Sequence, residues 1–209
     1  MAKKASPRQP SADRILDAAL DLAAETRWRD VTMEQVARES GASLQRVHDL
    51  FPTKTAFVSA FMRRTTEAVL ADHDFGDAAE PVRERLLDVL MRRFDALGPR
   101  KAAIRSILRD AGNDPMATLC TAPAFLESMA WSLEAAGLGA SGPMGALRLK
   151  GLSVIYLSAM RTWLRDDTED LSPTMAHLDR SLTRADTLMQ RLPFCRLPRR
   201  RPEERNANV

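Results

Sequence analysis

The chain has 209 residues, a formal net charge of +3, and 44% hydrophobic and 28% charged residues. A chain of this length can bury a sizeable core without disulfides or a structural metal. The cysteines Cys120 and Cys195 form no C-x-x-C pair, so we expect free thiols in a reducing compartment. No apolar run approaches the roughly 20 residues of a membrane span, and no apolar core follows the basic N-terminus, so we expect a cytoplasmic protein.

The charge is unevenly distributed along the chain. Residues 1–64 hold 11 Lys or Arg against 8 Asp or Glu, residues 193–209 hold 5 against 2, and residues 65–192 hold 15 against 18. The basic terminal segments can bind phosphate groups, either in nucleic acid or in lipid head groups, whereas the middle of the chain is acidic. Solvated basic tails are the other interpretation.

Helical spacing of apolar residues dominates the first third of the chain. Ser11, Thr32 and Ser43 are placed as N-caps, and Gly41 is placed to end a helix. The predicted helices cover residues 12–26, 33–40, 44–51 and 54–73.

The same spacing continues to residue 192. The predicted helices cover residues 82–97, 100–112, 122–137, 145–167 and 172–192. Because no strand-period hairpin is visible, the predicted fold class is all-α, a small N-terminal head on a larger helical bundle. The tail over residues 193–209, rich in Pro and Arg, is expected to be disordered.

Residues 33–51 have the layout of a helix-turn-helix. A turn that begins with glycine separates the two helices, and Ala37 is small where they must approach. Val36, Val47 and Phe51 can face the first helix and form one core. Such hairpins also occur in proteins that do not bind DNA, so this layout alone leaves the function open.

From Arg14 to about Val69 the sequence resembles the DNA-binding head of the tetracycline-repressor (TetR) family of bacterial regulators. The matching elements are Ile15-Leu16, Ala18-Ala19, Trp28, Thr32, Val36-Ala37, Gly41-x-Ser43, Phe51 and Lys54. The resemblance implies a basic arm (1–10), a helix-turn-helix domain (11–58), a helical effector-binding and dimerisation domain (59–192) and a basic tail (193–209).

The resemblance also implies a homodimer that binds a palindromic operator in double-stranded DNA as a ligand-responsive regulator, a repressor. The helix Ser43–Phe51 would enter the major groove, with Gln45, Arg46 and His48 nearest the bases and phosphates. Thr32 and Lys54, both at helix starts, would clamp backbone phosphates. The last two helices would form the dimer interface.

Flexible apolar and aromatic side chains are frequent in the body of the chain. Such side chains can line a site for a small apolar effector or lipid, and they also fill ordinary helical cores. The candidate ligand-binding residues are Phe125, Met129, Trp131, Tyr156, Met160 and Trp163.

A second resemblance keeps another function open. Residues Gly151 to Leu192 resemble the C-terminal helices of the lipid-binding accessory proteins of ubiquinone biosynthesis, which share the TetR fold. That resemblance implies a protein that binds a lipid or isoprenoid and does not read DNA. Two features of the presumed recognition helix favour it: Asp49 adds a negative charge, and His48 stands where the TetR family has a tyrosine.

Other motifs are weak. Residues 137–142 match G-x-G-x-x-G, but no strand precedes them and Pro143 follows. His48, His73 and His177 have no partners at metal-ligand spacing, and no G-x-S-x-G nucleophile motif is present. We therefore expect no metal, no cofactor and no enzymatic activity.

Overall fold

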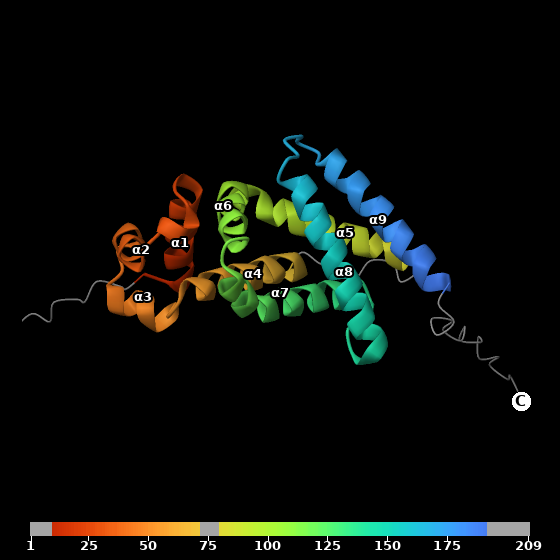
Figure 1. The fold of residues 1–209 in the computed structure, drawn as a ribbon, viewed down its shortest axis with the longest axis horizontal. Helices are drawn as coiled ribbons and strands as arrows, with labels where there is room; N and C mark the ends of the chain where they lie inside the picture. The colour runs from red at the N-terminus through yellow and green to blue at the C-terminus, as the bar shows by residue number, and fades with distance from the viewer. Residues whose placement is uncertain (1–9, 72–79, 192–209) are drawn as a thin grey trace, which may run out of the picture.

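The computed structural model describes residues 10–71 and 80–191, and all regular structure in these ranges is helical. The predicted all-α class is thus confirmed. The molecule is elongated, with the N-terminal helices at one end (Figure 1). The elements are α1 (Ala12–Glu25), η1 (Trp28–Asp30), α2 (Met33–Ser40), α3 (Leu44–Leu50), α4 (Lys54–Ala71), α5 (Val82–Leu97), η2 (Gly98–Arg100), α6 (Lys101–Ala111), α7 (Pro115–Ala135), α8 (Gly142–Trp163) and α9 (Ser172–Arg191).

Helices α1, α2 and α3 form a compact head, and its helix ends follow the predicted caps. The hydroxyls of Ser11, Thr32 and Ser43 each accept a hydrogen bond from the backbone amide three residues later, at 3.3, 3.2 and 3.1 Å. Gly41 ends α2 with φ +69°, a left-handed conformation that glycine adopts without strain.

The core of the head joins the start of α4. Val36 and Val47 are buried in one core with the apolar residues of α1, as predicted. The ring of Phe51 stacks on Phe57 at 4.2 Å between centroids, and Phe57 meets the edge of Trp28 at 6.4 Å. These contacts fix α4 to the head. Because α4 then runs unbroken past residue 58, the predicted domain boundary, head and body share this helix (Figure 1).

The body consists of α5 to α9, with the second half of α4 packed against α7. Helices α8 and α9 lie side by side, and α9 also packs against α5 (Figure 1). Leu152, Leu178 and Leu182 are buried in this region, as are Phe94 and Trp163 deeper in the body. The body thus has its own apolar core, continuous with that of the head.

Two predicted helix starts were wrong. Helix α7 begins at Pro115, seven residues before the predicted start, because Asp114 caps it by accepting a hydrogen bond from the Ala117 amide at 2.9 Å. Pro123 lies within α7 on an exposed side, where water can replace the hydrogen bond that proline removes. Helix α8 begins at Gly142 rather than residue 145, with Pro143 in its first turn.

Some predictions fall outside the described residues. These are the basic arm except for Pro10, the basic tail, His73 and Cys195. Within the described residues, no helix combines the length and the hydropathy that crossing a membrane requires.

Candidate nucleic-acid interface and interior site

Helix α3 lies at the end of the molecule farthest from α9, with one face open to solvent (Figure 1). Gln45 and His48 are exposed on it. Leu44, which the sequence analysis did not select, is 52% exposed and is an apolar group that can meet a thymine methyl. Two of the predicted base-contacting side chains, Gln45 and His48, are therefore accessible to DNA from solvent.

Arg46 and Asp49 give α3 mixed charge. Arg46 is half-buried, and its Nε atom is buried without a hydrogen-bond partner. The Asp49 carboxylate is exposed, and its Oδ1 lies 3.8 Å from Nδ1 of His48.

The two predicted hydroxyl residues act on their own helices. Thr32 forms a capping box with Gln35, whose side chain accepts a hydrogen bond from the Thr32 amide at 2.7 Å. Ser43 caps α3. Both side chains stay exposed beside helix N-termini, where backbone amides favour an anion.

Lys54 is turned toward the head. Its Nζ donates to the backbone carbonyl oxygens of Trp28 and Arg29, the latter at 3.1 Å, and lies 4.9 Å from the Trp28 ring centroid. Burial lowers the pKa of Lys54, and the charges of Asp110 and Asp30 partly oppose this shift. In this structure Lys54 links α4 to η1, so it does not present a free ammonium to phosphate.

Helix α6 joins the head to the body. Ser106 Oγ accepts from the Trp28 amide at 2.9 Å and donates to the Thr26 carbonyl at 3.0 Å. Asp110 Oδ2 accepts from the Arg29 amide at 2.7 Å. These bonds satisfy the backbone of the segment between α1 and α2.

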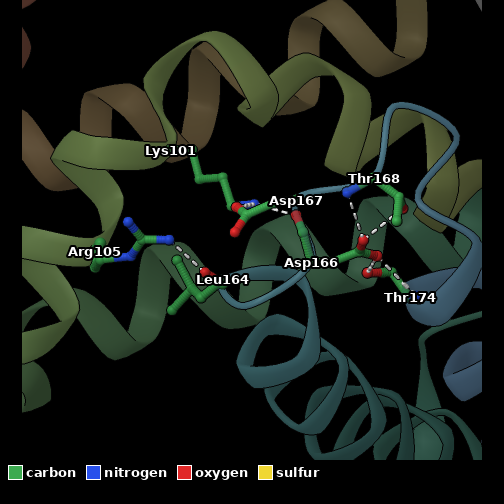
Figure 2. A network of polar contacts seen from close by, with 7 residues as sticks. All are labelled: Lys101, Arg105, Leu164, Asp166, Asp167, Thr168 and Thr174. Carbon is green, nitrogen blue, oxygen red and sulfur yellow. Dashed lines mark hydrogen bonds and ion pairs between the residues drawn. The ribbon is translucent and has the colours of Figure 1, made fainter.

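The other side of α6 holds the connection between α8 and α9 (Figure 2). Lys101 Nζ donates to the Asp166 carbonyl, and Arg105 Nη2 donates to the Leu164 carbonyl at 2.5 Å. The Asp166 carboxylate accepts from the amides and hydroxyls of Thr168 and Thr174. Helix α6 is thus bound to the head and to the end of α8 by polar contacts.

A cleft of about 480 Å³ lies between the head and the body. Trp28 and Lys54 line it from the head side, and Ile107, Asp110 and Thr118 from α6 and α7. A second hollow, an apolar groove of about 390 Å³, lies between α5, α8 and α9; it contains Leu86, Ile155 and Leu188, with Arg83 and Arg148 beside them.

The predicted ligand-binding residues are mostly core. Met129, Tyr156, Met160 and Trp163 are buried, and none of the six lines the cleft or the groove. Phe125 is half-buried, 6.0 Å from Tyr156 between ring centroids. Trp131 instead lies on an outer side of α7, 48% exposed, apart from the buried members of the set.

Arg93 on α5 is a polar residue that the sequence analysis missed, and it is only 3% exposed. Its Nε donates to the Tyr156 hydroxyl at 3.3 Å, Nη1 to Thr66 Oγ1 at 3.3 Å, and Nη2 to Ser128 Oγ. An arginine therefore lies beside Tyr156, inside the predicted ligand-binding region.

Comparison with solved structures decides the fold. A TetR transcriptional regulator from Nitrosomonas europaea is 25% identical, with a TM-score of 0.67 over 84% of this chain and 97% of that one. A TetR transcriptional regulator from Rhodococcus sp. RHA1 is 22% identical, with a TM-score of 0.62 over 86% of this chain and 96% of that one. A TetR-family regulator from Streptomyces coelicolor is 20% identical, with a TM-score of 0.55 over 85% of this chain and 79% of that one. This chain has the TetR fold.

No protein-family model matches the chain, and no curated protein is significantly similar to it in sequence. The predicted TetR resemblance therefore rests on structure over most of the chain, at low sequence identity. TetR-family regulators are not enzymes, in agreement with the expectation from the sequence. Within the described residues, no group of three or more His, Cys, Asp or Glu side chains is placed to hold a metal ion.

The sequence pattern of α5 already indicates that Arg93 is buried. Leu86, Val89, Leu90 and Phe94 form the buried stripe of α5, and Arg93 lies at the helical spacing of that stripe. A charged residue at a core position indicates either a buried network or a ligand contact.

Proposed function

We propose that this protein is a ligand-responsive DNA-binding transcriptional regulator, a repressor that acts as a homodimer. The observation that carries the proposal is the open face of α3 at the tip of a TetR fold, where Gln45 and His48 are exposed and Arg46 is half-buried beside them. A helix presented in this way can enter the major groove.

Each side chain on α3 has a defined chemistry toward DNA. Arg46 pairs with guanine or phosphate, and Gln45 pairs with adenine. The N-termini of α2 and α3, with Thr32 and Ser43 at their caps, offer backbone amides to phosphates. Lys54 is left out of the proposed contacts, because its ammonium binds backbone carbonyls of the head.

An exposed apolar surface on α8 and α9 supports the homodimer. Leu149 and Ile155, candidates for the interface, are half-buried, whereas Leu152 lies in the core behind them. Exposed apolar side chains that cluster on a surface mark interaction sites. The large exposed apolar residues of the two helices are Leu147, Val154, Leu157, Met175 and Leu188.

A lipid-binding protein without DNA recognition is the second candidate. Two observations favour it: the exposed carboxylate of Asp49 repels phosphate, and the apolar groove between α5, α8 and α9 has a volume within the range of ligand sites. The same groove is compatible with an effector site or a dimer contact in the regulator.

Selection from a random duplex pool, followed by titration of the enriched sequence at two salt concentrations, separates the candidates. For the regulator we expect a palindrome with half-sites about 34–36 Å apart. Arg46→Ala should weaken binding to that sequence by about 1–3 kcal/mol and relax preference at one base pair.

Arg38→Ala is the matched control, since Arg38 is exposed on the neighbouring α2 and pairs with Glu34. It should change specific and random binding alike. If no palindrome emerges and binding stays at the roughly 10⁻⁴–10⁻⁶ M of non-specific contact, the regulator is rejected in favour of the lipid-binding protein.

A further inference from the structure

Arg93 lies where four helices of the body meet. It projects from α5 and donates hydrogen bonds to Thr66 on α4, Ser128 on α7 and Tyr156 on α8. The hydroxyls of Thr66 and Ser128 also bond each other, at 2.6 Å. All four side chains are buried.

Arg93 has no charged partner among the residues that the structure describes. Among residues 10–71 and 80–191, no carboxylate forms an ion pair with it, and all three of its acceptors are neutral hydroxyls. A buried guanidinium normally has a carboxylate or phosphate partner, because hydroxyl dipoles replace only part of its hydration.

The cluster also lacks acceptors. A guanidinium has five N–H donors, and Arg93 uses three of them toward described residues, which leaves one N–H on Nη1 and one on Nη2. The Tyr156 hydroxyl accepts from Arg93 and donates to no described residue. Burial raises the pKa of Tyr156 and Arg93 partly opposes this, so the phenol keeps its proton as a donor.

We propose that the Arg93 cluster binds the anionic group, a carboxylate or a phosphate, of the effector. This inference rests on the proposed function of the protein as a ligand-responsive regulator. The anion supplies the missing charge and accepts from Arg93 and Tyr156, and the Ser128 hydroxyl turns to donate to it. Charge-assisted bonds of this kind are stronger than the bonds to hydroxyls that they replace.

The surroundings define the rest of the ligand. Phe94 stacks on Tyr156 at 5.3 Å between centroids, Phe125 lies 6.0 Å from Tyr156, and Trp163 lies 5.5 Å from Phe94. These rings pack on one another in the core, so an acid that reaches Arg93 with an aromatic or aliphatic body takes the place of part of this packing. The apolar effector expected from the sequence becomes an amphiphilic anion.

The cluster also connects the ligand to the head. Thr66 belongs to α4, whose first residue, Lys54, is bound to η1. An anion that takes the guanidinium away from Thr66 and Ser128 removes the Arg93 bridge between α4 and α7 and leaves the Thr66–Ser128 hydrogen bond as the polar link of the cluster between these helices. Occupancy then changes how α4, and with it α3, is held.

The test uses the full chain and matched acid and neutral probes. Benzoate and octanoate represent carboxylates, phenyl phosphate represents phosphates, and benzyl alcohol and octanol are the neutral partners. We expect at least one acid to raise the melting temperature in a concentration-dependent way, with its neutral partner giving no such rise. A rise in melting temperature with the carboxylates or with the phosphate shows which of the two anionic groups the cluster binds.

Two variants assign the effect to the cluster. Arg93→Gln should weaken binding of the active acid by at least about thirty-fold, whereas the neighbouring Arg92→Gln, whose side chain pairs with Asp88 on the same helix, should bind like the native chain. If Arg93→Gln does not fold, Tyr156→Phe, which removes one donor, should weaken binding several-fold.

The inference is overturned if no acid shifts the melting temperature more than its neutral partner, or if the acids bind the Arg93 and Tyr156 variants as well as the native chain. Operator binding is measured separately. A chain that binds DNA but no acid contradicts this inference alone. A chain that binds an acid at Arg93 but selects no DNA sequence contradicts the regulator and keeps the anion site.

Discussion

The carboxylate of Asp110 on α6 accepts a hydrogen bond from the backbone amide of Arg29 in η1, at 2.7 Å. The two residues are 81 positions apart, and their bond joins the body to the head. Asp110 is buried, so the Arg29 amide has no equivalent acceptor if the carboxylate is removed.

Removing this acceptor should destabilise the protein. Asp110→Ala should lower the free energy of unfolding by about 1–3 kcal/mol, because a partly buried amide loses its partner. Asp110→Asn, which keeps a carbonyl acceptor, should lose less. Urea denaturation measures both; Asp167→Ala is the control, since Asp167 is highly exposed and its Oδ1 lies 3.5 Å from Lys101 Nζ. Equal stability of Asp110→Ala and the native chain would show that the hydrogen bond from the Arg29 amide does not stabilise the protein.

Asp166 should make stability depend on acid pH. Burial raises the pKa of Asp166, but hydrogen bonds from Thr168 and Thr174 outweigh this and hold the pKa below its ordinary value. The folded carboxyl therefore binds protons more weakly than the unfolded one. Its stabilisation is full above the ordinary carboxyl pKa of about 3.9 and is lost as the pH falls through the lower folded value.

The matching variant is Asp166→Asn, which cannot accept from both threonines as a charged group. We expect it to be less stable than the native chain at pH 7, with the difference shrinking below about pH 4. Denaturation curves across pH 2–7 measure this. A difference that stays constant over the whole range would show that the charge of Asp166 has no part in it.

Lys54→Ala should act on stability rather than on DNA. The ammonium of Lys54 binds the Trp28 and Arg29 carbonyls, so its loss should lower the free energy of unfolding by about 1–2 kcal/mol. The slope of log affinity against log salt should stay as in the native chain. A slope flatter by about one unit would instead show a phosphate contact by Lys54.

Asp49→Asn should tighten DNA binding. The Asp49 carboxylate is exposed on α3, where it repels phosphate, and its removal should raise affinity roughly two- to five-fold, about 0.5–1 kcal/mol. Fluorescence anisotropy at low salt measures the change. Glu67→Gln on α4, far from α3 along the chain, should leave affinity unaltered; a gain as large as that of Asp49→Asn would mean that net charge alone is responsible.

Val154→Glu should give monomers. Val154 is 69% exposed on α8, in the proposed dimer surface, where a buried charge without a partner is unfavourable. Light scattering at micromolar concentration should report a dimer for the native chain and half that mass for the variant. Leu119→Glu, on the exposed side of α7, is the control and should stay dimeric. A native monomer would refute the interface.

Local signals predicted the head well, because its helix ends depend on neighbouring residues. The Ser11, Thr32 and Ser43 caps and the Gly41 stop all appear in the structure. The start of α7 was missed because Pro123 resembles a helix start in sequence, although an exposed proline is tolerated within a helix.

Long-range polar pairing was the part that sequence could not supply. The inward turn of Lys54 depends on the carbonyls of Trp28 and Arg29, which lie 25 or more positions away. Similarly, the hydroxyl partners of Arg93 come from three other helices, so no local pattern could show that its charge lacks a counter-ion.

The two-sided attachment of α6 has a consequence for the choice of operator. The Ser106 and Asp110 bonds hold the head, and the Lys101 and Arg105 bonds hold the end of α8, so each head keeps one orientation on its body as long as these bonds stay intact. In the proposed dimer, one extra base pair between half-sites displaces the second half-site by about 3.4 Å and rotates it by about 34–36°. A head fixed in this way cannot follow that rotation. Operators of this protein should therefore share one spacer length and tolerate changes of base more readily than insertions.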